Sequence, residues 1–552
     1  ISGNIGANVN ISIPVLPVPP LVININAGIG GTVNAEAGTT AAEMRMLDLD
    51  GDGLPDQVLR TADGMWWKRN LAGTADYISE VRYPWGGKCS FGYGLVPGTA
   101  DSPHAQYCMT ECVIDDGCAE GAHLAAHGAH SVRVRYAYSD AYYERLHRDS
   151  YGYGLVDAVY DDGSYTRTEY ANREYYSRYI PVHTYTYGRR TADSPVELLG
   201  ESRTALRPAP CAQPVREESA QYGSSGSRAG MRTDYSYGAY GNVTHLEQVP
   251  LKNGSPDPAA ALSADMEYDD SKARYLHSLP VSVEVYGGDG KLLRRRTGSY
   301  DDYGALISLK QYHNDSEAAE YAYTYDAYGN MLSVTDGLGI KTAYTYDGTL
   351  HQYPLTATRT GGATSYTSST AWDYVAGTKT SETDINGNTM RYAYDGWQRL
   401  VSIRSPYDTG SVPAVKYSYG VDGAGRWYAV TDNKVTFDAG DSSVIQTVIQ
   451  ADGLGRAART AKTGVVYDRA AGRKRTGWNV GGAVAYDWKG RIVEQGQPYF
   501  IEGNLSALNL GTGAITATMV RPTLTEYDSL DRVVKATLPD GSVQTVEYDV
   551  AP

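Results

Sequence analysis

The fold of this chain is decided by the stretch Tyr323-Thr324-Tyr325-Asp326-Ala327-Tyr328-Gly329-Asn330-Met331-Leu332-Ser333-Val334-Thr335. Tyrosines two positions apart place both rings on one face of an extended strand. Asp and Asn bond their own backbone in turns, and Gly supplies the positive φ that a tight turn needs. An alternating segment, 331–335, follows as a second strand. The stretch therefore predicts a β-hairpin with a compact turn.

This hairpin unit recurs along the chain. Turn residues follow many of the Tyr-x-Tyr pairs, and copies are spaced by about 20 residues or a small multiple. The pairs are Tyr136/Tyr138, Tyr185/Tyr187, Tyr235/Tyr237, Tyr323/Tyr325, Tyr344/Tyr346, Tyr392/Tyr394 and Tyr417/Tyr419. Regular recurrence of one supersecondary unit predicts a repeat array rather than several unrelated domains.

Composition supports extensive sheets with partly hydrated faces. The 552 residues include 48 Tyr but only 3 Phe, so the aromatic area carries polar tips that reach water or a partner. The 61 Gly and 24 Pro indicate many turns. A net charge of −15 disfavours nucleic acid and anionic membranes as general partners. No apolar run reaches the roughly 20 residues that a membrane-spanning helix needs.

The beginning of the chain is Gly-, Asn-, Val- and Pro-rich. Alternation predicts strands at Asn8–Ile13 and Leu21–Ile25, and the nearby prolines place them at edges or in connections. The first residues lack the basic and apolar regions of a signal peptide. We expect the sequence to be a segment of a longer polypeptide. One short helix is predicted at Pro258–Asp265.

An acidic loop, Asp48–Asp56, is the strongest local motif. Asp48, Asp50, Asp52 and Asp56 offer side-chain oxygens at positions one, three, five and nine, and the carbonyl of Leu54 serves position seven. Ca²⁺ takes six to eight oxygen ligands, so this spacing predicts a structural calcium site. The loop lacks the flanking helices and final Glu of an EF-hand and resembles the calcium loop of integrin-type propeller blades. A turn without an ion is the alternative.

A Cys- and His-rich region, residues 88–130, is predicted to be a loop-like insertion. Its cysteines, Cys89, Cys108, Cys112 and Cys118, are candidates for two disulfides that would staple it. Zinc is a second interpretation, because tetrahedral sites use Cys and His. Unpaired thiols are a third. The spacing of the cysteines is not that of a standard zinc motif.

The repeats resemble the Rhs or YD repeats of bacterial polymorphic toxins and animal teneurins. The resemblance covers roughly residues 231–552. It rests on the stretches 325–330, Asp384–Asn388 with Tyr394-Asp395, Asp452-Gly453-Leu454-Gly455-Arg456, 527–534, 539–541 and Tyr548-Asp549. This family implies an all-β fold, a spiral β-sheet shell of hairpins.

The front of the chain resembles the B component of bacterial insecticidal toxin complexes. The matching features are the acidic loop, Tyr142-Tyr143, and the stretch 151–163. In that family the end of a β-propeller, here an FG-GAP-like module, precedes the shell. The expected organisation is 1–80 for strands and the propeller-like calcium-loop module, 81–230 for the start of the shell with the 88–130 insertion, and 231–552 for the Rhs/YD shell.

The resemblance implies a secreted or cell-surface shell that encapsulates a C-terminal effector and works with a translocation partner. The alternative is an extracellular adhesion protein that binds glycans or proteins through the rigid repeats. No catalytic signature occurs in these residues, so the chain is not expected to be an enzyme. Trp372, Trp397 and Trp488 are candidates for sugar stacking, although packing between hairpins is the favoured role.

Overall fold

The computed structural model describes most of the chain from residue 42 onward. The described ranges are 42–61, 63–117, 131–188, 197–208, 210–223, 226–270, 274–314, 316–408, 410–421, 427–437, 441–481, 483–487, 489–508 and 520–548. The predicted strands at Asn8–Ile13 and Leu21–Ile25, together with Cys118 and Trp488, lie outside these ranges.

The described residues form three antiparallel sheets, which confirms the all-β prediction. The first, at the N-terminal side, holds β1 (Ala42–Leu47), β2 (Asp56–Thr61) and β3 (Gly64–Lys68). The third holds β33 (Val484–Tyr486), β34 (Ile492–Gln497), β36 (Val520–Tyr527), β37 (Val533–Thr537) and β38 (Val543–Thr545).

The second sheet is much larger, and sequence neighbours pair along nearly all of it. Its strands are β4 (Glu80–Arg82), β5 (Lys88–Val96), β6 (Gln106–Asp115), β7 (Ser131–Glu144), β8 (Asp149–Tyr160), β9 (Tyr165–Tyr170), β10 (Pro181–Tyr187), β11 (Leu198–Leu206), β12 (Pro214–Tyr222), β13 (Arg228–Tyr237), β14 (Val243–Lys252), β15 (Ser255–Pro256), β16 (Leu262–Tyr268), β17 (Pro280–Gly287), β18 (Leu292–Tyr300), β19 (Leu306–Tyr312), β20 (Ala318–Tyr325), β21 (Met331–Thr335), β22 (Lys341–Tyr346), β23 (Pro354–Gly361), β24 (Thr364–Asp373), β25 (Thr378–Thr383), β26 (Thr389–Tyr394), β27 (Leu400–Arg404), β28 (Val415–Val421), β29 (Trp427–Lys434), β30 (Val444–Ala451), β31 (Ala457–Asp468), β32 (Arg473–Gly481) and β35 (Tyr499–Glu502).

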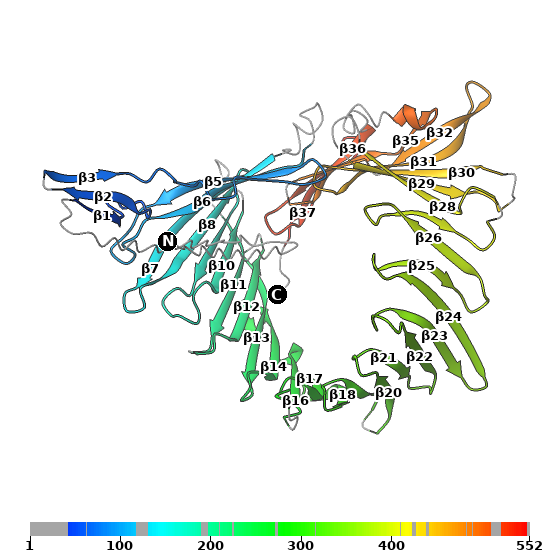
Figure 1. The fold of residues 1–552 in the computed structure, drawn as a ribbon, viewed down its shortest axis with the longest axis horizontal. Helices are drawn as coiled ribbons and strands as arrows, with labels where there is room; N and C mark the ends of the chain where they lie inside the picture. Colours follow the sequence, from blue (N-terminus) through cyan, green and yellow to red (C-terminus); the bar gives the residue numbers. More distant parts are fainter. Residues whose placement is uncertain are drawn as a thin grey trace.

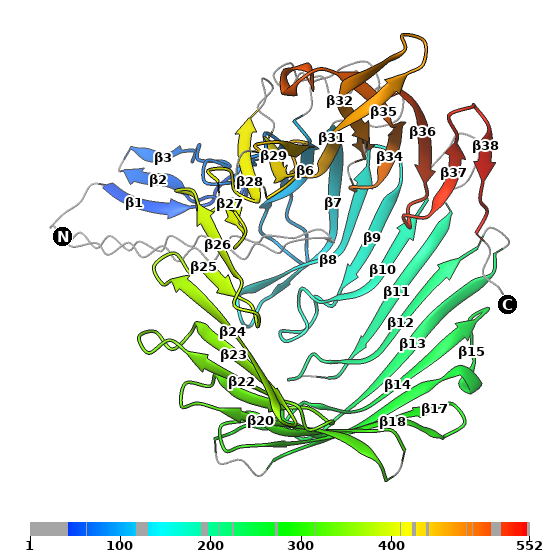
Figure 2. The same ribbon diagram turned by 90° about the vertical axis from the view of Figure 1, so that its right-hand side faces the viewer.

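This large sheet bends into a wall around an open space (Figure 1; Figure 2). It runs without interruption through residue 230, where the sequence predicts a boundary between two parts of the shell. Two short 3-10 helices accompany the strands, η2 (Pro258–Ala260) and η3 (Leu505–Leu508). The architecture is that of a curved sheet, closed by contacts between turns that are far apart in sequence.

Aspartate shapes the hairpin turns. At the turn between β20 and β21, the Asp326 carboxylate accepts hydrogen bonds from the backbone N–H of Tyr328 at 2.9 Å and of Asn330 at 2.8 Å. Gly329 adopts a φ of +88°, which a residue with a Cβ adopts only under strain. The side chain of Asn330 also bonds Asp326, and these donors hold the pKa of Asp326 below its usual value. Turn shaping, not paired acid-base chemistry, explains this aspartate.

A tyrosine at the end of a strand ties that strand to its neighbour. The Tyr325 hydroxyl, at the end of β20, donates to the carbonyl of Leu306, the first residue of β19, at 3.0 Å. Tyr346 and Tyr419 make the same bond to Met331 and Leu400, which begin β21 and β27. In these three pairs the second tyrosine therefore links its strand to the start of the adjacent strand.

The same bond recurs along both larger sheets. The other tyrosines that donate to a carbonyl at or beside the start of a neighbouring strand are Tyr237, Tyr268, Tyr300, Tyr394, Tyr486 and Tyr527. Trp372 makes an equivalent bond from its indole N–H to Pro354 at 2.9 Å. Burial raises the pKa of Tyr325 and Tyr346, so these hydroxyls keep their donor proton at neutral pH.

Arginine replaces the turn asparagine in later repeats. Arg456 bonds the Asp452 carboxylate of its own turn and the Asp487 carbonyl of the next turn. Its guanidinium also lies over the Tyr486 ring, 4.5 Å from the centroid. Arg491 repeats this arrangement with the following turn and with Tyr527. Arginine therefore links consecutive turns in this part of the chain.

Two local predictions are corrected by the structure. The region 88–130 is not a loop-like insertion where it is described, because β5 and β6 are long strands that pair with each other, with one irregularity at Gly92/Tyr93. Their glycines and cysteines obscure the alternation in the sequence. The helix predicted at Pro258–Asp265 is only the single turn η2, and β16 begins at Leu262 because the extended segment pairs with β14 and β17.

Replacing Tyr325 by Phe tests the role of the tyrosine hydroxyl. The change Tyr325→Phe keeps the ring but removes one partly buried hydrogen bond, so we expect a loss of about 1 kcal/mol in unfolding free energy. Urea denaturation followed by circular dichroism measures it. The control Tyr328→Phe removes a hydroxyl from a ring that is 66% exposed, and it should change stability much less. Equal losses in both variants would contradict the interpretation.

Candidate functional site: a closing seam and an acidic loop

The two faces of the large sheet have different chemistry. Residues that lie opposite each other on paired strands share a face of the sheet. Following these pairs from β13 to β28 places Tyr235, Tyr323 and Tyr417 on the same face. The opposite face carries pairs of hydroxyl groups, including Thr345 with Thr356 at 2.6 Å. We call these the tyrosine face and the hydroxyl face.

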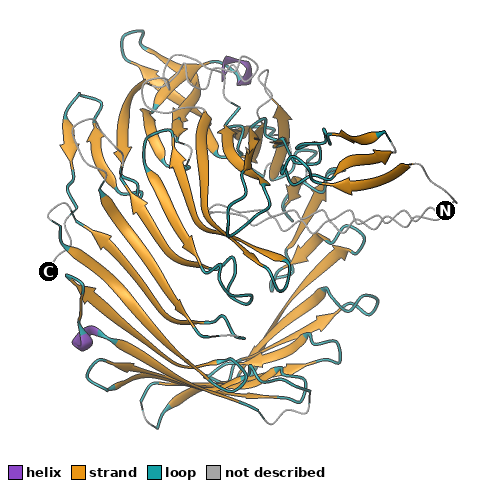
Figure 3. Cartoon of the chain, turned by 90° about the vertical axis from the view of Figure 1, so that its left-hand side faces the viewer, coloured by secondary structure: helices purple, strands orange, loops and turns teal. Residues whose placement is uncertain are grey.

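The position of η3 identifies the tyrosine face as the inner one. η3 contributes Leu508 to a core with Val430, Val448 and Val480 on β29–β32. These valines lie on the face opposite Tyr417, and η3 lies on the outer side of the wall (Figure 1; Figure 3). The tyrosines therefore face the enclosed space, and the hydroxyl pairs face outward.

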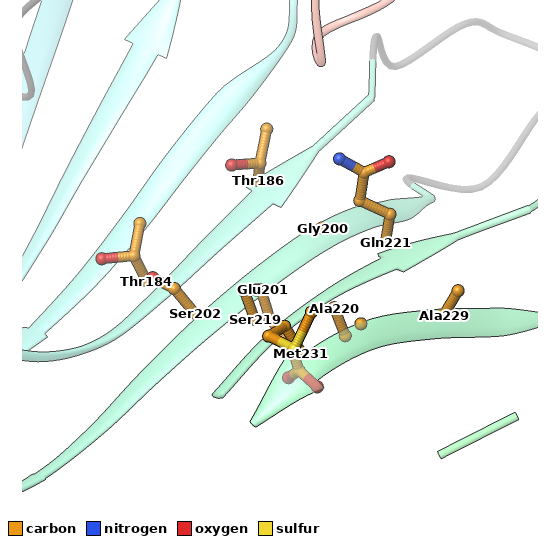
Figure 4. A pocket seen from close by; sticks show the side chains of 11 residues that line it. Thr184, Thr186, Gly200, Glu201, Ser202, Ser219, Ala220, Gln221, Ala229 and Met231 are labelled. Atoms are coloured by element: carbon orange, nitrogen blue, oxygen red, sulfur yellow. The ribbon is translucent and has the colours of Figure 1, made fainter. Parts of the chain in front are cut away.

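A shallow groove of about 420 Å³ lies on the inner face of β10–β13. Small side chains make it, among them Thr186, Gly200 and Ser202, with Gln221 at its side (Figure 4). Leu530, from the turn between β36 and β37, lies at Gly200, where a Cβ would be 3.2 Å from its methyl group. The third sheet therefore contacts the inner face of the second.

A seam joins the first hairpin of the large sheet to strands more than 300 positions later. The indole N–H of Trp427 donates to the carbonyl of Pro84 at 2.6 Å, and its ring meets Trp85 edge-on with centroids 5.7 Å apart. The backbone N–H of Gly87 donates to the carbonyl of Gly453 at 2.7 Å. These contacts bring the β4–β5 turn onto the β30–β31 turn.

Glycine is required at the seam because three backbone segments meet there. A Cβ on Gly453 would lie 2.0 Å from the carbonyl oxygen of Asp116 and 2.6 Å from the nitrogen of Gly87. A Cβ on Gly117 would lie 2.6 Å from the carbonyl oxygen of Gly86. Atoms this close exclude any side chain at either position. The seam is thus a specific close approach of backbones, not a loose contact of loops.

The acidic loop brings three of its carboxylates together. Asp48, Asp50 and Asp56 each place an oxygen within 4.8 Å of the others. Backbone hydrogen bonds fix these groups: Asp48 accepts from Gly51 at 2.8 Å, and Asp56 accepts from Asn70 at 2.8 Å. The bond from Asn70 is the largest of several that hold the pKa of Asp56 below its usual value. The loop thus holds three carboxylates in a compact group.

Asp52, the fourth predicted carboxylate ligand, is placed differently. It is buried and lies 3.3 Å from the guanidinium of Arg69, which also contacts Asp50 at 2.6 Å. Arg69 therefore neutralises part of the loop. Gly53 packs so closely on the carbonyl of Ala105 that a Cβ would lie 2.5 Å from it, which fixes the loop against the segment leading into β6.

The other predicted site residues are dispersed. Cys89 and Cys112 lie together on β5 and β6, Cys108 contacts the Tyr153 hydroxyl at 3.4 Å, and all three carry free thiols in the structure. Trp372 packs on Tyr353, as a structural residue does. Trp397 is 84% exposed at the β26–β27 turn. The sequence does not by itself predict the seam, although Gly86-Gly87 and the Gly453-Leu454-Gly455 stretch were a signal for it.

The fold matches solved structures of bacterial toxin complexes. TcdB2-TccC3 without its hypervariable C-terminal region superposes with a TM-score of 0.68, at 12% identity, covering 92% of this chain and 37% of that one. TcdB2-TccC3 itself gives a TM-score of 0.65 at 12% identity, covering 92% of this chain and 35% of that one. The Tc holotoxin pore of Photorhabdus luminescens gives 0.67 at 11% identity, covering 92% and 37%.

These likenesses establish the fold predicted from the repeats. The chain spans little more than a third of the length of the structures that it matches. No family model matches the sequence, and no curated protein matches it either. Within the described residues, no helix is long and apolar enough to cross a membrane.

Adding a methyl group at Gly453 tests the seam. Gly453→Ala would push the β30–β31 turn away from Asp116, so we expect a destabilisation of about 1–3 kcal/mol. We also expect faster hydrogen exchange in the turn 83–87, measured by mass spectrometry. The control Gly348→Ala adds the same methyl group where nothing lies within 4 Å, and it should have little effect. Unchanged exchange in the Gly453→Ala variant would show that the seam does not close the sheet.

Proposed function

We propose that the chain is a section of a secreted shell protein that encloses a C-terminal effector and takes part in its delivery. The observation that carries the proposal is the closed wall itself. A sheet whose ends are joined at a seam separates an inner volume from solvent and from other proteins. The match over 92% of the chain to a TcdB2-TccC3 structure supports the proposal.

The distribution of side chains supports enclosure. From β13 to β28 the second tyrosine of each Tyr-x-Tyr pair directs its hydroxyl to a backbone carbonyl, as Tyr325 and Tyr419 do. Rings whose polar tips are occupied in this way leave an inner surface that is aromatic but already hydrogen-bonded. Such a surface can contact an extended polypeptide without offering it a competing strand edge. The outer hydroxyl pairs suit contact with water.

Protection from proteolysis tests the enclosure. The complete natural polypeptide would be digested under native conditions, and fragments following residue 552 would be identified by mass spectrometry. We expect the C-terminal part to resist digestion in the wild type and in Gly348→Ala, and to be digested faster in Gly453→Ala. Rapid digestion of the C-terminal part in the wild type would reject enclosure. An extracellular adhesion role would then be the better interpretation.

We further propose that the acidic loop binds one structural Ca²⁺ ion. Asp48, Asp50 and Asp56 are the converging carboxylates, and hard oxygen ligands of this kind suit Ca²⁺. Asp52 and the carbonyl of Leu54 would complete the set after Asp52 leaves Arg69. The ion would fix the loop between the first sheet and the segment around Ala105. The predicted propeller module of residues 1–80 is the context in which such a loop would act.

Calcium titration tests this site. We expect a Kd of about 10⁻⁴–10⁻³ M by calorimetry, as for extracellular modules, and a rise in melting temperature with Ca²⁺. Asp50→Asn should weaken binding, while Arg69→Gln should strengthen it several-fold because a competing cation is removed. Asp63→Asn, a nearby change outside the carboxylate group, is the control. No binding heat and no thermal shift at millimolar Ca²⁺ would leave a turn held by Arg69 and by its backbone hydrogen bonds, without an ion.

A further inference from the structure

Two cysteines are neighbours across the β5–β6 hairpin. Cys89 lies on β5 opposite Ile114, and Cys112 lies on β6 opposite Phe91. Because register alternates faces, Cys89 and Cys112 project from the same face as diagonal neighbours. That face is the inner one, shared with Val134. Both cysteines are 9% exposed.

The remaining described cysteines are engaged or remote. The thiol of Cys108 donates to the Tyr153 hydroxyl on β8. Cys211 is exposed in the connection between β11 and β12. The hydroxyl of Tyr83 lies 3.5 Å from the sulfur of Cys89 and closes that side of the pair. Among the described cysteines, the geometry therefore singles out Cys89 and Cys112 as partners.

We propose that Cys89 and Cys112 form a disulfide bond that locks the β5–β6 hairpin directly beside the seam. Cys89 is two positions after Gly87, and Cys112 is four positions before Asp116. Gly87 and Asp116 are the two residues that approach Gly453 from this hairpin. A covalent link between β5 and β6 would hold the register that presents both residues to the β30–β31 turn.

The reaction needs an oxidant of the small-disulfide class, for which oxidised glutathione serves. The Cys89 thiolate attacks one glutathione sulfur, forms a mixed disulfide and releases one glutathione thiolate. The Cys112 thiolate then attacks the Cys89 sulfur and releases the second glutathione. One sulfur–sulfur bond forms and one breaks, and the two thiol protons and two electrons leave in two reduced glutathione molecules.

The local environment favours Cys89 as the first nucleophile. A hydrogen bond from the Cys112 thiol lowers the pKa of Cys89, and the Tyr83 hydroxyl acts in the same direction. The same bond and burial raise the pKa of Cys112. The pair thus contains one thiol that ionises readily beside one that holds its proton, which is the arrangement needed for stepwise exchange.

Peptide mapping tests the pairing. The wild type and a triple variant with Cys108→Ser, Cys118→Ser and Cys211→Ser would be equilibrated with mixtures of oxidised and reduced glutathione. Free thiols would then be alkylated. Cleavage after Glu111 and after Tyr107 separates Cys89, Cys108 and Cys112 into different peptides. We expect a Cys89–Cys112 link in both proteins, reversible by dithiothreitol, and a higher melting temperature for the oxidised form.

Two results would overturn the proposal. One is complete alkylation of Cys89 and Cys112 in every glutathione mixture. The other is a wild-type map in which either cysteine is joined to Cys108 or Cys118 instead. The variant Cys89→Ser is the control, since it should abolish the link and the thermal shift on oxidation while leaving the reduced melting temperature close to that of the wild type. If the triple variant does not fold, the wild-type map alone decides.

Discussion

The bond from a tyrosine hydroxyl to the first carbonyl of a neighbouring strand is the interaction on which this structure depends. A long antiparallel sheet has few means of fixing its own register, because every two-residue slip restores the same alternation of faces. Tyr325 removes that freedom, since its hydroxyl reaches the carbonyl of Leu306 only when β19 and β20 are correctly aligned. Repetition of the bond from Tyr237 to Tyr527 fixes the register hairpin by hairpin. This requirement explains why Tyr outnumbers Phe so strongly in the chain.

Turn chemistry converts this local rule into a curved wall. Aspartates such as Asp326 hold each turn in one conformation through backbone hydrogen bonds. Arginines such as Arg456 then couple one turn to the next. Because both devices are short and stiff, the bend at each hairpin is reproducible, and small bends add up along the sheet. The wall returns to its starting point, where backbone meets backbone at Gly453 and no side chain is tolerated.

The inner face, the outer face and the joints of the closed wall carry different kinds of side chain. The inner face carries tyrosines, of which those such as Tyr325 and Tyr419 bond a neighbouring strand, the outer face carries paired Thr and Ser hydroxyls, and the joints carry glycine, tryptophan and cysteine. The proposed disulfide and the acidic loop both lie close to the same end of the sheet, where the first hairpin begins. A disulfide in the β5–β6 hairpin would stabilise one side of the seam. Gly87 and Asp116, at the two ends of this hairpin, are the residues that approach Gly453. Enclosure of a polypeptide would depend on that joint more than on any single repeat.

The sequence by itself determined the repeating unit. Tyr-x-Tyr, Asp and Gly act within one hairpin, so their spacing predicted the strands, the turns and a repeat array, while the shell was implied by the resemblance to Rhs/YD repeats. The spacing of Asp48 to Asp56 predicted a loop with converging carboxylates. Only the tertiary structure decided which face of the sheet is inner, because that depends on the sum of many small bends. It also decided the seam between Pro84 and Trp427, which joins residues that no local pattern relates. It placed Asp52 on Arg69 instead of with the other carboxylates, and it turned the expected Cys-rich insertion into paired strands. In each case the residue that fixes the arrangement lies on a different strand or loop. A local sequence pattern cannot predict such a contact.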